Sequence, residues 1–313
     1  MGSQTQGKLN WLQHTLPEGL VVDSGWLEHH NVSRQLRRKY VMNGWLLTLA
    51  RGVYCRPSPS EQPSPLPWQQ LVISLNALLN FPVAAGGRTA LELQGFSHYV
   101  AASAAREAHL FSNEDLPGWV SRVPVNTKLV LHSAQKLFQN RDVPPYFTAG
   151  TAPPPEDSGF TEQTWGHWKY PVTVSTPERA ILELLNEVPK SETFHQADVL
   201  MEGLRNLSPR RLQGLLADCR NVKVKRLFLW FADRHNHAWL PKLVQSATRG
   251  VPIATEFDPP ASLPSSANHC CFKVDTRSEL WADVIQQGSL MVHVPEAPNG
   301  LALTVYALLG DRP

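Results

Sequence analysis

The sequence predicts an α+β protein in which a small N-terminal winged helix-turn-helix domain precedes a larger mixed α/β domain that is mainly helical. Residues 1–58 hold seven lysines and arginines against three acidic residues, whereas the remaining residues hold 22 basic and 24 acidic ones. A basic amphipathic segment in this region is followed at once by two short apolar runs around a glycine. Five prolines between residues 57 and 67 then stiffen the chain and end the first domain.

Composition limits the possible classes of protein. With 313 residues, of which 42% are hydrophobic and 18% charged, the chain is long enough for two or more globular domains. Its four cysteines show no CxxC spacing, which argues against a disulfide framework or a zinc ribbon. The start lacks the apolar core of a signal peptide, and the most apolar stretch, residues 71–85, is too short to span a bilayer. We therefore expect a cytoplasmic protein without a membrane partner.

Three short helices are predicted before the first apolar run. Residues 8–15 form the first, and Ser24 caps a second that ends near Asn31. Ser33 caps a third helix that runs to about Asn43, where Asn-Gly supplies the stop. The buried stripe of this third helix recurs at four-residue spacing and consists of Val32, Leu36 and Tyr40.

The third helix is basic on the side that faces away from this stripe. At about 100° per residue, Arg34 and Arg38 lie opposite the stripe, with Gln35 and Arg37 beside them. A solvated helix face is the ordinary explanation of an isolated basic helix. The elements that follow decide between that explanation and a nucleic-acid contact.

A hairpin with a basic tip follows the basic helix. Residues 45–49 and 53–56 form two short strands around Arg51 and Gly52, and the glycine permits the positive φ of a tight turn. Helix, helix, basic helix and hairpin is the order of a winged helix-turn-helix domain. The third helix would enter the major groove of DNA, and Arg51 would reach the adjacent backbone or minor groove. The hairpin therefore favours DNA binding over the solvated face.

The proline-rich segment divides the chain. We expect a DNA-binding domain over residues 1–58, a linker over 59–67 and a second domain over 68–313, of which 244–313 is poorly assigned. A glycine pair precedes Arg88, but no Lys-Ser/Thr follows it, so a tight turn is favoured over a phosphate-binding loop. The other expected elements are a helix at 67–80, a short helix within 86–96, strands at 106–113 and 127–134, and a loop at 144–159.

Helices dominate the chain after a strand at 170–174. Helices are predicted at 176–188, 191–207, 208–220 and 221–240, and the last should be the core helix because it is apolar on nearly every side at its centre. Ser175 or Thr176 caps the first of these helices, and Ser191 caps the second. A basic cluster runs through the last two helices and their neighbours, either as an anion-binding surface or as a solvated rim: Arg205, Arg210, Arg211, Arg220, Lys223, Lys225 and Arg226.

Motifs for catalysis are not found. The 12 histidines include no HExxH and no metal-ligand spacing, and His269-Cys270-Cys271 is expected in a polar loop. Four acids lack the Glu-x-Lys pair expected of nuclease carboxylates and are more consistent with solvated loops, namely Glu256, Asp258, Asp275 and Glu279. We therefore expect no enzyme, no cofactor and no metal.

The combination of these segments resembles the AbiEi family of antitoxins from type IV toxin–antitoxin systems. The segments that carry the resemblance are SRQLRRKYVMNGWLLTLARGVYCRP, GGRTALELQGFSHYV, VSTPERAILELLNEVP, ADVLMEGLRNLSPRRLQGLLADC and VKVKRLFLWFADRH, within residues 8–243. The resemblance implies a winged-helix domain that represses its own operon by binding inverted repeats in the promoter. It also implies a second domain that counteracts a nucleotidyltransferase-like toxin in phage abortive infection, without a stable complex.

Site residues follow for each domain. The resemblance implies DNA contacts at Ser33, Arg34, Gln35, Arg37, Arg38, Lys39 and, on the wing, Arg51. It gives no residues for antitoxicity, and charge alone suggests a surface around Arg210, Arg211, Lys223 and Arg226. Two alternatives stay open: a winged-helix transcription factor whose second domain senses a ligand, and a nuclease that the winged helix directs to DNA.

Overall fold

The structure is a computed structural model of the whole chain. It describes residues 2–58, 65–96, 107–145, 156–166, 169–243, 269–274, 291–292 and 303–308. The chain separates into two compact units, residues 1–252 and 253–313, which are treated separately below. Helices and strands occur together in the larger unit, so the predicted α+β class is confirmed.

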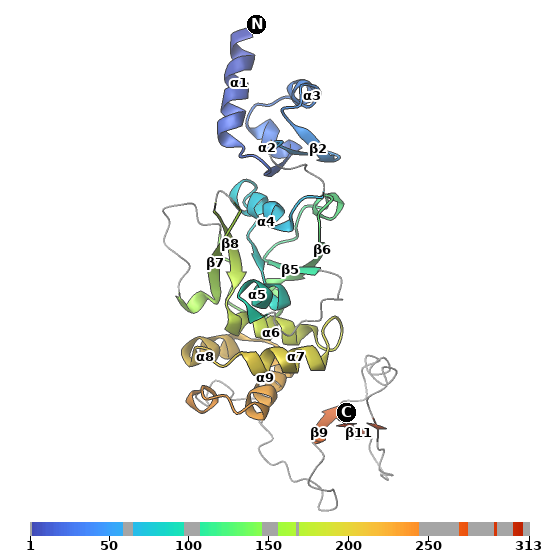
Figure 1. The fold of residues 1–313 in the computed structure, drawn as a ribbon, viewed down its shortest axis with the longest axis vertical. Coiled ribbons are helices and arrows are strands. Elements are labelled where there is room, and N and C mark those ends of the chain that lie inside the picture. Colours follow the sequence, from blue (N-terminus) through green and yellow to red (C-terminus); the bar gives the residue numbers. More distant parts are fainter. Residues whose placement is uncertain are drawn as a thin grey trace, which may run out of the picture. The chain divides into compact units, whose positions relative to one another are not determined.

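The N-terminal elements form a three-helix cluster beside a small antiparallel sheet of order β1-β3-β2 (Figure 1). Apart from the additional strand β1, the elements follow the order of three helices and a hairpin that the winged helix-turn-helix prediction gave. Leu12, Leu27 and Tyr40 are buried between these elements. The elements are α1 (Gly2–Thr15), β1 (Val21–Asp23), α2 (Ser24–His29), α3 (Arg34–Met42), β2 (Leu47–Ala50) and β3 (Val53–Cys55).

Two details of this region differ from the sequence prediction. Strand β1 was not expected, and it pairs with β3 so that Val21 lies opposite Cys55. Helix α2 is capped by Asp23 rather than by Ser24, because the Asp23 carboxylate accepts the N–H of Trp26 at 2.8 Å.

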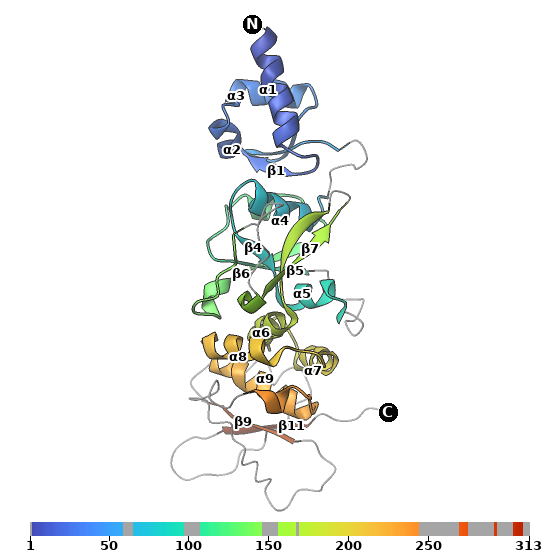
Figure 2. The ribbon, with the colours of Figure 1, turned by 90° about the vertical axis from the view of Figure 1, so that its left-hand side faces the viewer.

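A five-stranded mixed sheet of order β6-β5-β4-β8-β7 is the centre of the next part of the chain (Figure 2). Strands β5 and β6 are parallel, as are β4 and β8, whereas β4–β5 and β7–β8 are antiparallel. Strands β5, β6 and β8 were predicted, and β4 and β7 were not. The strands are β4 (Val83–Ala85), β5 (Glu107–Ser112), β6 (Lys128–Ser133), β7 (Phe160–Trp165) and β8 (Tyr170–Ser175).

Helix α6, like α4, is buried more completely than α9. Its residues from Glu178 to Leu185 are all buried, and it contacts α5, α7, α8, α9 and the sheet. Helix α9 buries one face only, so its expected role as core helix is wrong. Thr193 with Gln196 forms the capping box of α7, in place of the predicted Ser191. The helices are α4 (Trp68–Ala77), α5 (Gly87–Leu93), α6 (Pro177–Glu187), α7 (Phe194–Gly203), α8 (Pro209–Asp218) and α9 (Val222–Arg234).

The elements of residues 2–58 contact the sheet region through α4. The N–H of Val21 in β1 donates to the Ser74 hydroxyl at 2.8 Å, and this bond is buried. A Cβ on Gly19 would lie 2.9 Å from the Gln70 amide nitrogen, so the chain before β1 packs closely on the same helix. The two parts therefore share a packed contact in addition to the connecting segment.

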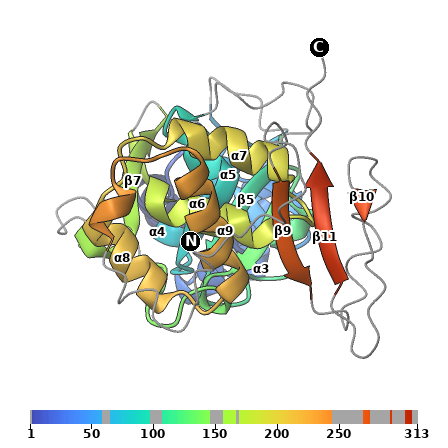
Figure 3. The ribbon, with the colours of Figure 1, turned by 90° about the horizontal axis from the view of Figure 1, so that it is seen from below.

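The second unit contains a three-stranded antiparallel sheet of order β10-β11-β9 (Figure 3), formed by β9 (His269–Val274), β10 (Met291–Val292) and β11 (Leu303–Leu308). His269-Cys270-Cys271 therefore lies in strand β9 and not in the loop that the sequence predicted. The four acids considered as nuclease carboxylates (Glu256, Asp258, Asp275 and Glu279) fall outside the described residues.

Candidate nucleic-acid interface

Helix α3 is fixed at both ends by its neighbours in sequence. The Ser33 hydroxyl accepts the N–H of Leu36 at 3.3 Å, so this predicted DNA contact is also the N-cap of the helix. Asn43 ends the helix, and Gly44 follows with a positive φ of 73°. Tyr40 is fully buried, which fixes the rotation of the helix about its axis.

Four of the predicted contact residues form the exposed face of α3. Arg34, Gln35, Arg38 and Lys39 are all exposed. Within the described part of the chain, none of the three cations on this face has an ion-pair partner. Their charges are therefore available to an external anion.

Arg37 does not belong to this face. The sequence placed it beside the exposed arginines, but it is only 5% exposed in the structure. Its guanidinium donates to the carbonyl of Ser24 and to the Glu28 carboxylate, each at 2.8 Å. Both partners belong to α2, so Arg37 holds α3 against α2 and is not available to DNA.

The predicted wing is the turn between β2 and β3. Arg51 is exposed at this turn, and Gly52 adopts the positive φ of 78° that the sequence analysis required. The N–H of Ser24 donates to the carbonyl of Gly52 at 2.8 Å. Ser24 therefore contacts the wing through its N–H and α3 through its carbonyl, which fixes Arg51 relative to the exposed face of α3.

The residues of the second basic cluster do not form one surface, because Arg211 and Lys223 bind at opposite ends of α6. Arg211 donates to the buried Glu178 at 2.9 Å, and Glu178 also accepts the N–H of Ser208, so this arginine ties the start of α8 to the start of α6. Lys223 donates to the carbonyls of Asn186 and Val188 at the other end of α6, at 3.2 and 2.6 Å. Partial burial lowers the pKa of Lys223.

Helix length measures this separation. Helix α6 has 11 residues, so at about 1.5 Å per residue its two ends are roughly 16 Å apart. Arg211 binds near the first end of α6 and Lys223 near the last. Arg210 and Arg226 are exposed, and Arg210 lies 3.3 Å from Asp157. Of the four residues suggested by charge, Arg211 and Lys223 therefore hydrogen-bond to α6 or to the residue that follows it, whereas Arg210 and Arg226 extend into solvent.

The glycine pair before Arg88 binds a carboxylate of the protein itself. The N–H of Gly87 donates to Glu183 at 2.9 Å, and the other oxygen of Glu183 accepts from Ser175 and Arg179 at 3.1 and 2.7 Å. The expected tight turn is present, since α5 begins at Gly87 with a positive φ of 53°. Glu183 occupies the place that a phosphate would take at this turn.

Comparisons with known families cover nearly the whole larger unit. Residues 105–251 match the model described as transcriptional regulator, AbiEi antitoxin, type IV toxin–antitoxin system. Residues 5–102 match the model of the AbiEi antitoxin N-terminal domain. The chain belongs to the AbiEi antitoxin family. Its members are described as transcriptional regulators and antitoxins, which agrees with the exposed basic face of α3.

Three further comparisons add no information about function. Residues 236–308 match a family described as bacterial type VI secretion, VasE, but most of this segment lies outside the described residues. The crystal structure of the RV2827C protein from Mycobacterium tuberculosis is similar over 77% of this chain and 82% of that chain, at 15% identity and a TM-score of 0.45. At this TM-score the likeness carries no inference. No curated protein matches the chain in sequence.

The AbiEi N-terminal family model ends beyond the predicted domain boundary. It extends to residue 102 and includes α4, β4 and α5, although β4 lies inside the five-stranded sheet. The boundary at residues 58–68 therefore stays a prediction. No helix in the described part of this AbiEi chain is long and apolar enough to cross a membrane.

Sequence reasoning missed two arginines of the AbiEi second domain. Arg179 and Glu183 are spaced four residues apart on α6, which is a signal for an ion pair, but their complete burial was not expected. Arg141 lies in a loop without any motif, and only the structure brings it against α8.

Proposed function

We propose that this AbiEi family member represses its own toxin–antitoxin operon by binding inverted repeats in the promoter. Helix α3 enters the major groove, and the turn at Arg51 contacts the adjacent backbone or minor groove. The second domain counteracts a nucleotidyltransferase-like toxin without a stable complex. The observation that supports operator binding is the exposed face of α3, whose cations have no ion-pair partner within the described residues.

The chemistry of the exposed face suits base recognition at the start of α3. Arg34 and Gln35 occupy the first turn, the part of a recognition helix that reaches base edges. Arginine pairs with guanine through two hydrogen bonds, and glutamine pairs with adenine in the same way. Arg38 lies one turn further on the same side of the helix. Lys39 and Arg51 then supply contacts with phosphates.

An inverted repeat requires two copies of the winged helix. A palindromic operator presents two half-sites related by a two-fold axis, and each half-site accepts one α3. We therefore expect two chains to bind each pair of repeats, with the half-sites spaced by about one turn or an integral number of turns of DNA.

Operator binding is tested with the full-length chain and a duplex that contains the inverted repeats upstream of its own operon. The wild type should shift this duplex at concentrations that leave a scrambled duplex free. Arg34→Ala/Arg38→Ala should lose the preference, while Arg122→Ala, an exposed arginine outside this face, should keep it. Equal binding of both duplexes by the wild type would exclude specific recognition of the inverted repeats.

Antitoxicity is assigned to the second domain, and the exposed cations there are the first candidates. Arg210 and Arg226 face solvent, whereas charge reversal at Arg211 or Lys223 would also break contacts with α6. Toxin neutralisation by Arg210→Glu and Arg226→Glu, each expressed from a foreign promoter, therefore tests this surface without damage to those contacts. Full growth rescue by both variants would exclude these cations from antitoxicity.

A further inference from the structure

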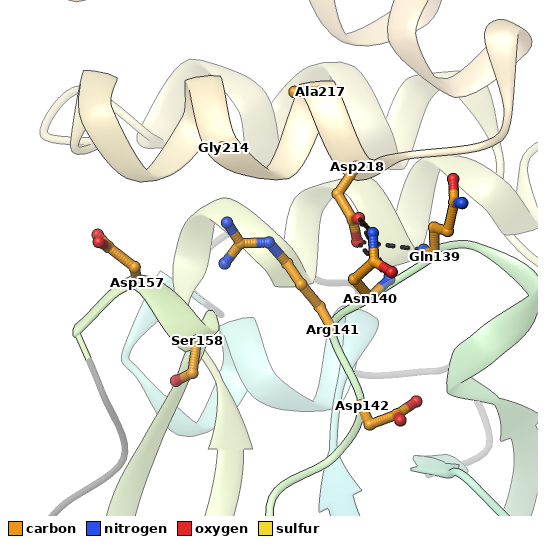
Figure 4. A pocket seen from close by; sticks show the side chains of 9 residues that line it. All are labelled: Gln139, Asn140, Arg141, Asp142, Asp157, Ser158, Gly214, Ala217 and Asp218. Atoms are coloured by element: carbon orange, nitrogen blue, oxygen red, sulfur yellow. Dashed lines mark hydrogen bonds between the residues drawn. The ribbon is translucent and has the colours of Figure 1, made fainter.

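A groove of about 590 Å³ lies between α8 and two loops of the sheet region (Figure 4). One loop comprises residues 139–142, the other Asp157 and Ser158, and α8 contributes Gly214, Ala217 and Asp218. A neighbouring hollow shares Arg141 and Asp157 with it and continues along α8 to Arg210 and Arg211. The volume lies within the range of about 300–1,000 Å³ that small-molecule sites occupy.

Arg141 is the cation without a partner in this groove. Its side chain extends toward α8, between Asp157 and Asp218 (Figure 4). Within the described residues its guanidinium has neither a hydrogen bond nor an ion pair, and only its main-chain carbonyl is used. Gly214 makes room for it, since a Cβ there would lie 2.6 Å from the Arg141 guanidinium. The planar guanidinium is thus free to bind a phosphate with two hydrogen bonds.

A second arginine lies behind the wall of the groove. Arg179 is fully buried between the rings of Phe138 and Phe160, 4.4 and 4.1 Å from their centroids. Its Nε donates to Glu183 at 2.7 Å, and its Nη1 donates to the carbonyl of Arg141 at 2.9 Å. Its Nη2 is buried and has no partner among the described residues. Arg179 therefore adds positive potential behind Arg141, which Glu183 and, more weakly, Asp218 offset.

The carboxylates of the groove limit the kind of anion that fits. Asp218 accepts the N–H groups of Gln139 and Asn140, and Asp157 pairs with Arg210 at the rim. With Asp142, three carboxylates line the same space. A continuous chain of phosphates would be repelled by these carboxylates more strongly than one phosphate held at Arg141. The exposed carboxylates can in turn accept hydrogen bonds from hydroxyl and amino groups.

We propose that this groove binds a nucleoside 5′-phosphate, with the phosphate on Arg141 and the ribose hydroxyls on the carboxylate of Asp157. A carboxylate that accepts from ribose hydroxyls is a common device of nucleotide sites. The phosphate can belong to a free nucleotide or to the 5′ end of a nucleic acid, because Arg141 meets the same group in both. This site is separate from α3 and does not depend on operator binding.

Calorimetric titration of the full-length chain tests the proposal. Adenosine and uridine 5′-monophosphates are the probes, with inorganic phosphate, adenosine and a hexanucleotide with or without a 5′-phosphate as further arms. Arg141→Ala removes the guanidinium. Gly214→Ala displaces it while favouring the helix, because alanine is a better helix former than glycine. Arg122→Ala is the control, an exposed arginine that is not among the groove residues.

Nucleoside monophosphates should bind more tightly than phosphate or adenosine, and both groove variants should weaken binding by roughly tenfold or more while Arg122→Ala does not. Tighter binding of the phosphorylated hexanucleotide, lost in Arg141→Ala, would identify the nucleic-acid end as the source of the phosphate. Equal affinity in Arg141→Ala, or binding by inorganic phosphate as strong as by the nucleotides, would overturn the proposal. Absence of binding up to about 5 mM ligand would overturn it as well.

Discussion

The guanidinium of Arg37 donates to the main-chain carbonyl of Ser24 at 2.8 Å, and this bond joins α3 to α2. The N–H of the same serine donates to the carbonyl of Gly52 in the turn between β2 and β3. One residue of α2 therefore contacts both elements that we propose to meet DNA. Both contacts use main-chain atoms of Ser24, so they do not depend on its hydroxyl.

Arg37→Met should weaken both folding and operator binding. The change keeps the buried stem but removes the hydrogen bonds to Ser24 and Glu28, which should lower the free energy of unfolding by about 1–3 kcal/mol. The matched control is Arg38→Met, one residue along, where the side chain is exposed. The control should retain stability and weaken operator binding. Thermal unfolding together with gel shifts separates the two effects, and unchanged stability in Arg37→Met would contradict the structural role of this arginine.

Gly86→Ala should destabilise the second domain. A Cβ at this position would collide with the Glu183 carboxylate and the Phe111 ring, and both groups are buried, so neither has room to move. Overpacking of this kind costs typically about 1–3 kcal/mol. Gly118→Ala is the control, since a Cβ there meets nothing within 4 Å. Urea unfolding of both variants measures the difference, and equal midpoints would show that the turn at Gly86 can relax.

The buried carboxyl of Glu192 should make stability fall as pH rises. Burial raises the pKa of Glu192 to about 7, although Arg88 lies 2.7 Å away and opposes the shift. A group whose folded pKa is raised contributes most below its unfolded pKa, and that contribution is lost as pH rises through the folded value. His109 acts in the opposite sense, because burial lowers its pKa to about 4 and the loss occurs as pH falls toward that value.

Glu192→Gln isolates the contribution of the carboxyl. The variant keeps the shape of the side chain and does not ionise, so the advantage of the wild type over the variant should shrink between pH 5 and pH 8. The decrease should be on the order of 2 kcal/mol, because one pKa unit corresponds to about 1.4 kcal/mol. Urea unfolding at each pH measures it. A difference that stays constant over this range would mean that Arg88 keeps Glu192 ionised throughout.

Some elements of this fold could be predicted from the sequence because the residues that determine them lie within the element itself. Ser33 caps α3 and Gly52 permits the wing turn, and both act within a few residues. Strands β1 and β4 escaped prediction because each has three residues and depends on partners distant in sequence. Strand β7 escaped because most of its side chains are polar and partly exposed, as on the edge of a sheet.

The site was predictable only where exposure follows from helix periodicity. Arg34 and Arg38 are exposed as predicted, since they lie opposite Tyr40 on α3. Arg37 is buried because its guanidinium binds the carbonyl of Ser24 and the carboxylate of Glu28, both in α2. The residue pattern of α3 alone could not predict partners in another helix. The same reason hid the core position of α6, whose buried Arg179 and Glu183 neutralise each other.

Loss of operator binding should leave antitoxicity intact. Arg34 and Arg38 are exposed and make no described contact with the sheet region, so Arg34→Ala/Arg38→Ala should fold normally. Expressed from a foreign promoter, this variant should rescue growth against the toxin as well as the wild type does, while a reporter driven by the operon's own promoter is derepressed. Failure to rescue with the protein present at wild-type levels would show that the winged helix takes part in antitoxicity.

Single substitutions should distinguish base contacts from phosphate contacts. Arg34→Ala and Arg38→Ala should each cost about 1–3 kcal/mol on the operator and reduce the preference over scrambled DNA, because a bidentate contact with a base is lost. Arg51→Ala at the wing should weaken binding to operator and scrambled duplexes alike. It should also lower the slope of log affinity against log salt by about one, since one phosphate contact fewer releases one counterion fewer. Titrations at several salt concentrations measure both quantities. If Arg51→Ala changed the preference and Arg34→Ala changed only the salt slope, the two elements would have exchanged the roles assigned to them here.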